Sequence, residues 1–329
     1  MNQDSKINGA LHSAHAQMAS DEQRIREFAS RLPLHSLWNL HGLSVRALAI
    51  RTWNALVTDR IFGHAAELGF YFLFALFPTL FSASSILGLA ARSAHQFYDH
   101  LLDYLAILIP TPALSAVMST FNQTSAASTP GKFIFGLIAA IWSASVGISA
   151  VQDTLNAAYK IQDTRSYLRA RIYAIGLTIL LIIIVTVGLT SLFGGSLAAS
   201  LSHRVIYDPV MAYAISVAAR IISWLIAISL LSLTFAVIYY WAPDFKTRCW
   251  HWITPGGAIG MMGWLMASLS LRIYIHFFNS FSVTYGSLGA VIILLTWFYI
   301  TGLMLLLGAE INSEIEASAA ETHPSSQLE

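Results

Sequence analysis

An acidic side chain stands inside the first long apolar segment of this sequence. Glu67 follows His64 by three residues and precedes Tyr71 by four, so these side chains recur on one side of a helix. A carboxylate is costly against lipid, so Glu67 is expected to face protein, water or a cation. The alternative is that it lies among lipid headgroups or forms a structural ion pair. Pro78, in the same segment, removes a backbone hydrogen bond and predicts a kink.

A polar line also runs along the second apolar segment. Small hydroxyl residues at helical spacing commonly let two helices pack closely. The alternative is a hydrophilic path, with the Glu67 carboxylate facing an internal polar region that contains Asn156. The residues of the line are Trp142, Ser145, Ser149, Gln152 and Asn156.

Two arginines fall within later apolar segments. Arg220 and Arg272 either extend the polar path or reach the membrane surface with their long side chains. Together these residues define a candidate polar pathway across at least four helices. Its members are Glu67, Tyr71, Ser149, Gln152, Asn156, Arg220 and Arg272.

Glycines mark places where helices can approach one another closely. Gly256 and Gly260 are separated by three residues, a spacing typical of helix packing. Gly286 and Gly289 stand at the start of the last apolar segment, where they predict a tight entry into a helix. These glycines and Pro78 are therefore predicted to serve packing or bending rather than catalysis.

Motifs for enzymatic chemistry are missing from the sequence. The histidines lack the spacing of a zinc hydrolase, and no Gly-x-x-x-x-Gly-Lys-Ser/Thr loop is present for ATP. The single cysteine, Cys249, excludes an internal disulfide and a site with several thiolates. We therefore expect no metal, no cofactor and no catalytic residue, and the protein is predicted not to be an enzyme.

The elements that position these residues are predicted to be membrane-spanning helices. Of 329 residues, 56% are hydrophobic and 11% are charged, against roughly a quarter charged in a soluble domain. A span needs about 20 apolar residues, and six stretches meet that length. They cover residues 65–90, 133–155, 171–197, 211–241, 253–277 and 286–309. The predicted fold is an all-α polytopic membrane protein with six transmembrane helices.

The remaining segments frame this six-helix domain, which is predicted to cover residues 61–312. Residues 1–20 are predicted to be a disordered tail, and 21–60 a cytoplasmic amphipathic helical lead-in. Residues 96–109 are predicted to form a short surface helix on the opposite side of the membrane. Residues 313–329 are predicted to be a cytoplasmic tail, disordered from about residue 317.

The distribution of Lys and Arg predicts the orientation of the spans. Seven precede the first span, four lie between the second and third, and two between the fourth and fifth, whereas the opposite connections hold three. Positively charged loops remain in the cytoplasm, so both termini are predicted to be cytoplasmic. The net charge of +1 excludes a nucleic-acid partner bound by bulk electrostatics.

Several blocks of this sequence resemble the YihY/BrkB family of bacterial inner-membrane proteins, once labelled ribonuclease BN-like. Together the blocks extend from about residue 59 to residue 312. The first block runs from Asp59 to Pro78 and includes Ala65-Ala66-Glu67-Leu68-Gly69-Phe70-Tyr71. The second runs from Asn156 to Tyr159 and is followed by Arg165, Arg169 and Arg171. The third combines Pro243 to Lys246 with Pro255 to Ala258, and the fourth runs from Tyr285 to Asn312.

The resemblance implies a six-helix bundle in the bacterial cytoplasmic membrane. It also implies roles in envelope integrity, serum resistance or export, and it transfers no catalytic residue. We expect a transporter or permease-like protein for an envelope lipid, lipid precursor or amphiphile, with membrane lipids as partners. The alternative is a structural or assembly factor of the envelope that transports nothing; a nuclease or other hydrolase is a third. The oligomeric state is left open.

Overall fold

The computed structural model is all-α over the residues that it describes, which are 37, 38, 40, 42–90, 130–205, 207–245, 250–277 and 288–322. Six of its helices are long and apolar enough to cross a membrane, so the predicted fold class is confirmed. The predicted surface helix at 96–109 lies outside the described residues. The helices are α2 (Val45–Thr58), α3 (Ile61–Ala90), α6 (Pro130–Ala158), α7 (Tyr167–Val205), α8 (Pro209–Trp241), α9 (Pro255–Phe277) and α11 (Leu288–Thr322).

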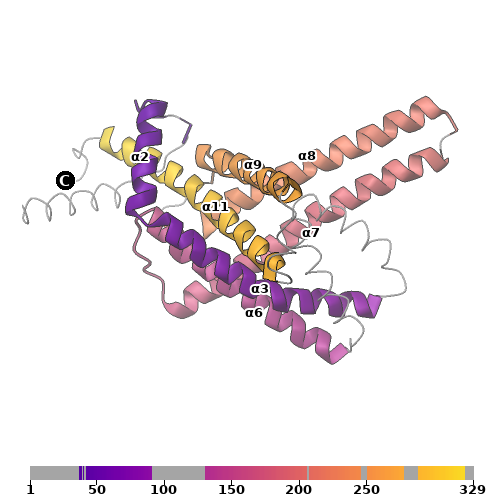
Figure 1. Ribbon diagram of the computed structural model, residues 1–329, viewed down its shortest axis with the longest axis horizontal. Coiled ribbons are helices and arrows are strands. Elements are labelled where there is room, and N and C mark those ends of the chain that lie inside the picture. The colour runs from indigo at the N-terminus through magenta and orange to yellow at the C-terminus, as the bar shows by residue number, and fades with distance from the viewer. Residues whose placement is uncertain are drawn as a thin grey trace, which may run out of the picture.

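Helix α11 lies at the centre of the packing, where it contacts α2, α3, α6 and α9. The main apolar core joins α3, α6 and α11 through fully buried side chains that include Leu68, Leu155 and Leu306. Helices α3 and α6 lie side by side, and α7 and α8 form a second pair that runs away from them (Figure 1). Helix α3 contains Pro78 and bends along its length (Figure 1).

Small side chains hold the α7–α8 pair together. Gly195 lies directly against the side chain of Ser223, and the Ser202 hydroxyl donates a hydrogen bond to the Ala212 carbonyl at 3.1 Å. The 39 residues of α7 correspond to about 58 Å of helix, against about 30 Å of hydrocarbon core. This pair must therefore tilt or project beyond the core.

The structure describes only part of the predicted lead-in over 21–60. Its described part is helical only from Val45 to Thr58, with Ser44 as the N-cap, and residues 42–44 are not helical. Gly42 has φ 86° and Arg60 has φ 54°, so the chain turns before and after α2. Over the described residues, local turns, which apolar periodicity does not reveal, limit the helix to 45–58, and residues 21–36 of the predicted lead-in lie outside the described residues.

The predicted tail after residue 312 is helix up to Thr322. Ile311 and Ile315 pack with Leu37 and Leu48, and the alanines of the last turns are also buried. Glu321 forms an ion pair with Arg51 of α2 at 3.2 Å. Small, weakly apolar residues look like a tail in the sequence, but here they let α2 approach α11 closely. The disorder predicted from residue 317 is therefore not found over 317–322.

Candidate functional site

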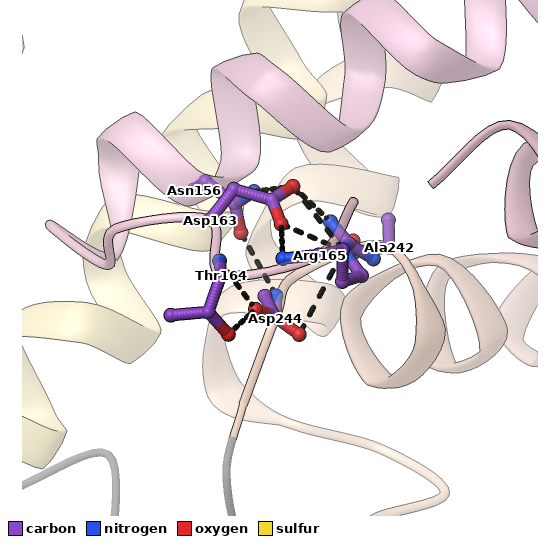
Figure 2. Close-up of polar contacts among 6 residues, drawn as sticks. All are labelled: Asn156, Asp163, Thr164, Arg165, Ala242 and Asp244. Atoms are coloured by element: carbon purple, nitrogen blue, oxygen red, sulfur yellow. Dashed lines mark hydrogen bonds and ion pairs between the residues drawn. The ribbon is translucent and has the colours of Figure 1, made fainter. Parts of the chain in front are cut away.

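The connection between α6 and α7 carries a buried arginine, Arg165, whose side chain is 4% exposed. Its Nε and Nη2 donate to the Asp163 carboxylate at 3.0 and 2.7 Å, and its Nη1 donates to the Ala242 carbonyl at 3.2 Å. Figure 2 shows its guanidinium between Asp163 and Asp244, at 3.7 Å from an Asp244 oxygen. One cation therefore joins this connection to the end of α8.

Asn156 and Thr164 complete the same contact. The Asn156 amide donates to Asp163 at 3.1 Å, and its carbonyl accepts the Asp244 backbone N–H at 2.9 Å. Asp244 also accepts the backbone N–H and the hydroxyl of Thr164, at 2.9 and 2.7 Å (Figure 2). We call these six residues, Asn156, Asp163, Thr164, Arg165, Ala242 and Asp244, the Arg165 cluster.

The Arg165 cluster keeps its charges paired. Burial alone would raise the pKa of Asp163, but hydrogen bonds and charge from Arg165 and the Asn156 amide outweigh burial and lower that pKa. Burial would lower the pKa of Arg165, but Asp163 and Asp244 raise it. The carboxylate and guanidinium thus stay ionised at neutral pH, bound mainly to each other. This arrangement is suited to fastening helix ends.

A second buried contact lies beside the Arg165 cluster and fastens α9 to α11. The Asn312 side-chain carbonyl accepts the Gly256 backbone N–H at 2.9 Å. Its amide donates to the Thr254 hydroxyl at 3.0 Å and to the Tyr159 hydroxyl at 3.4 Å. A Cβ added to Gly256 would overlap a carbonyl of α11, so glycine is required there. Gly260 lies in the same contact between α9 and α11, because a Cβ there would lie 2.8 Å from the Met304 carbonyl.

A polar seam between α6 and α7 contains a different kind of site. The Arg171 guanidinium lies 4.3 Å from the Trp142 ring centroid. Its Nη1 donates to the Ser149 hydroxyl at 3.2 Å, and its Nη2 donates to the Trp142 carbonyl at 3.3 Å. Gln152 lies on the same α6 face, 2% exposed, and its Nε2 has no hydrogen-bond acceptor in the part of the chain that the structure describes. We call Trp142, Ser149, Gln152 and Arg171 the α6–α7 seam.

The structure separates the predicted polar pathway into several places. Ser149 and Gln152 lie in the α6–α7 seam, whereas Asn156 bonds to Asp163 and Asp244 in the Arg165 cluster rather than to Glu67. The Glu67 side chain is 45% exposed, with its carboxylate 3.4 Å from His64 Nδ1. Ala65 and Leu68, its neighbours on α3, point inward and leave Glu67 on the outer face.

The other predicted residues lie apart from the seam. Tyr71 is partly buried at the α3–α6 core. Arg220 and Arg272 lie on exposed faces of α8 and α9. Arg272 is about 26 Å along α9 from its start, at 1.5 Å per residue. Gly289 is buried in α11, and Gly286 is outside the described residues.

Sequence reasoning gave no site role to Arg165, Arg171, Asp163, Asp244 or Asn312. Counting loop charges treats the two arginines only as orientation signals, and Arg171 is the first residue of the third predicted span, 171–197. A charge at that place in a span is the signal that could have identified the seam. Over the described ranges, no group of three or more His, Cys, Asp and Glu side chains could hold a metal ion.

Comparison with known proteins gives a consistent family signal. The family model for virulence factor BrkB matches residues 52–328. A ribonuclease-like protein of Bacillus subtilis (strain 168), YfkH, is 33% identical over 250 residues, which cover 76% of this chain and 88% of YfkH. The UPF0761 membrane protein Smlt0865 of Stenotrophomonas maltophilia (strain K279a) is 27% identical over 274 residues, 80% of this chain and 60% of that protein. No solved structure matches.

Proposed function

The chain belongs to the family of virulence factor BrkB, whose relatives include UPF0761 membrane proteins, and we propose that it is a transporter or permease-like protein for an amphiphile. The cargo class is an envelope lipid or lipid precursor. The chain spans 60% of the UPF0761 relative from S. maltophilia. The proposal includes the cytoplasmic membrane of a bacterium as the location, both termini in the cytoplasm, and no enzymatic activity.

The α6–α7 seam is the observation that carries this proposal. Ser149 and Trp142 lie about 10 and 21 Å along α6 from Asn156, at 1.5 Å per residue. If Asn156 lies near the membrane surface, the Arg171 guanidinium is held well inside the hydrocarbon core, which is about 30 Å thick. A charge at that depth is costly and typically marks a substrate or ion route.

The surroundings of the seam favour an amphiphile over a small ion. Trp142 is 57% exposed, and the exposed side chains near it on α6 and α7 include Ile138 and Ile172. A molecule with a polar head and apolar chains could place its head on Arg171 while the chains remain in lipid. Transport of such a molecule would proceed along the helix surface.

The second candidate function is a structural or assembly factor of the cell envelope. The Arg165 cluster favours it, because its charged groups are engaged within the protein and join helix ends that are distant in sequence. On this alternative the α6–α7 seam would be an internal contact.

The two candidates differ in what happens to lipids. We would compare the lipids of the two membrane leaflets, and the exported amphiphiles, in bacteria with and without the protein. Transport predicts that one amphiphile accumulates on the side from which it is normally removed. Unchanged leaflets and exports, together with a defective envelope, would contradict transport and support the structural role.

A further inference from the structure

Arg171 is held to α6 from more than one side without having its charge neutralised. Its two hydrogen bonds go to the Ser149 hydroxyl and the Trp142 carbonyl, which are both uncharged, and its third contact is the Trp142 ring. By contrast, Arg165 reaches the Asp163 carboxylate at 2.7 Å, and Arg51 reaches the Glu321 carboxylate at 3.2 Å. Among the described residues, no carboxylate lies within ion-pair distance of Arg171.

The α6–α7 seam contains N–H donors that have no acceptor among the described residues. A guanidinium has five N–H donors, and the two bonds of Arg171 leave three of them without an acceptor among the described residues, including the buried Nε. Gln152 Nε2 is also buried without an acceptor. A buried donor that has no acceptor is destabilising. These unmatched donors suit an anion with several acceptor oxygens.

We infer that Arg171 and Trp142 bind the phosphate headgroup of an anionic amphiphile that approaches α6 and α7 from the lipid. This inference rests on the proposed function and names the chemistry of its cargo. A guanidinium suits phosphate because its planar donors match two phosphate oxygens at once. Trp142 fixes the guanidinium plane from one side, and its exposed indole borders the acyl chains.

The binding test uses the purified full chain and dioleoylphosphatidylglycerol, with bound lipid counted by native mass spectrometry. Dioleoylglycerol, which lacks the phosphate, is the matched ligand control. Wild type is expected to retain phosphatidylglycerol and not dioleoylglycerol. Arg171→Gln should weaken that retention about tenfold, the loss of a charge-assisted contact. Arg46→Gln removes an exposed arginine of α2, outside the α6–α7 seam, and should leave retention unchanged.

The binding test also includes a second Arg171 variant and a soluble competitor. If Arg171→Gln does not fold, Arg171→Lys keeps the charge but loses the planar pair of donors, and it should still bind phosphatidylglycerol more weakly than wild type. Glycerol 3-phosphate added as competitor separates the sources of phosphate: competition at equal concentration would indicate a site for free phosphate esters and overturn the lipid assignment. Equal retention by wild type and the Arg171 variant that folds would overturn the inference.

The same preparation separates this inference from the proposed function. In proteoliposomes, movement of fluorescently labelled phosphatidylglycerol between leaflets is followed by chemical quenching from outside. Binding that depends on Arg171 without movement between leaflets would support the site and contradict transport. Movement between leaflets with binding that is independent of Arg171 would support transport and overturn the site.

Discussion

Replacing Arg165 by glutamine should destabilise the fold at the ends of α6, α7 and α8. The change removes the donations to Asp163 and to the Ala242 carbonyl, and it leaves two carboxylates, Asp163 and Asp244, close together without their cation. Removing one partner of a buried ion pair costs about 3–5 kcal/mol. Because Asp163 is 27% exposed and can regain water, we expect the lower end, about 3 kcal/mol.

That loss corresponds to roughly a hundredfold change in the ratio of folded to unfolded protein. It can be measured by thermal unfolding in detergent, with the surviving fraction read by size-exclusion chromatography. Arg169→Gln is the matched control, because Arg169 is an exposed cation near the start of α7. The double variant Asp163→Asn with Arg165→Gln should be less destabilised than the sum of the two single changes.

The predicted stabilisation by Arg165 would be refuted if Arg165→Gln and Arg169→Gln unfolded at the same temperature. It would also be refuted by simple additivity in the double variant, because additivity would mean that Asp163 and Arg165 do not stabilise each other. Either result would show that the bonds between Arg165 and Asp163 in Figure 2 contribute no net stability.

Three further outcomes are expected. Because the pKa of Asp163 is lowered in the folded protein, the stability that Asp163 contributes is fully present above its unfolded pKa, near 3.8. That contribution is lost as the pH falls through the folded pKa. Asp163→Asn should therefore flatten the acid limb of a curve of stability against pH. Gly256→Ala should cost about 1–3 kcal/mol in unfolding assays because its Cβ overlaps a carbonyl of α11, whereas Gly63→Ala, with open space around it, should cost little. In a Cys249→Ser background, impermeant thiol reagents should label Gly63→Cys only from the cytoplasm and Tyr207→Cys, at the α7–α8 turn, only from outside; labelling of both from one side would contradict the orientation.

The sequence by itself determined the six spans and the class of protein. Backbone groups inside lipid must be satisfied within a helix, so long apolar runs with few charges leave one local solution. This constraint depends only on neighbouring residues, which is why the predicted spans lie close to the observed helices. The spacing of Gly256 and Gly260 was readable for the same reason, although their partners on α11 were not.

Only the tertiary structure decided which polar residues meet. Asp244 binds Thr164 across 80 positions of sequence, and Arg171 binds Ser149 from another helix. Helical periodicity shows that residues share a face, but not whether that face meets protein or lipid. For this reason the sequence left open whether Glu67 faces an internal polar region or forms a structural pair at headgroup depth, and in the structure its side chain is 45% exposed beside His64. Likewise, the helical end of α11 depends on its contact with α2, because no local signal distinguishes its alanines from a tail.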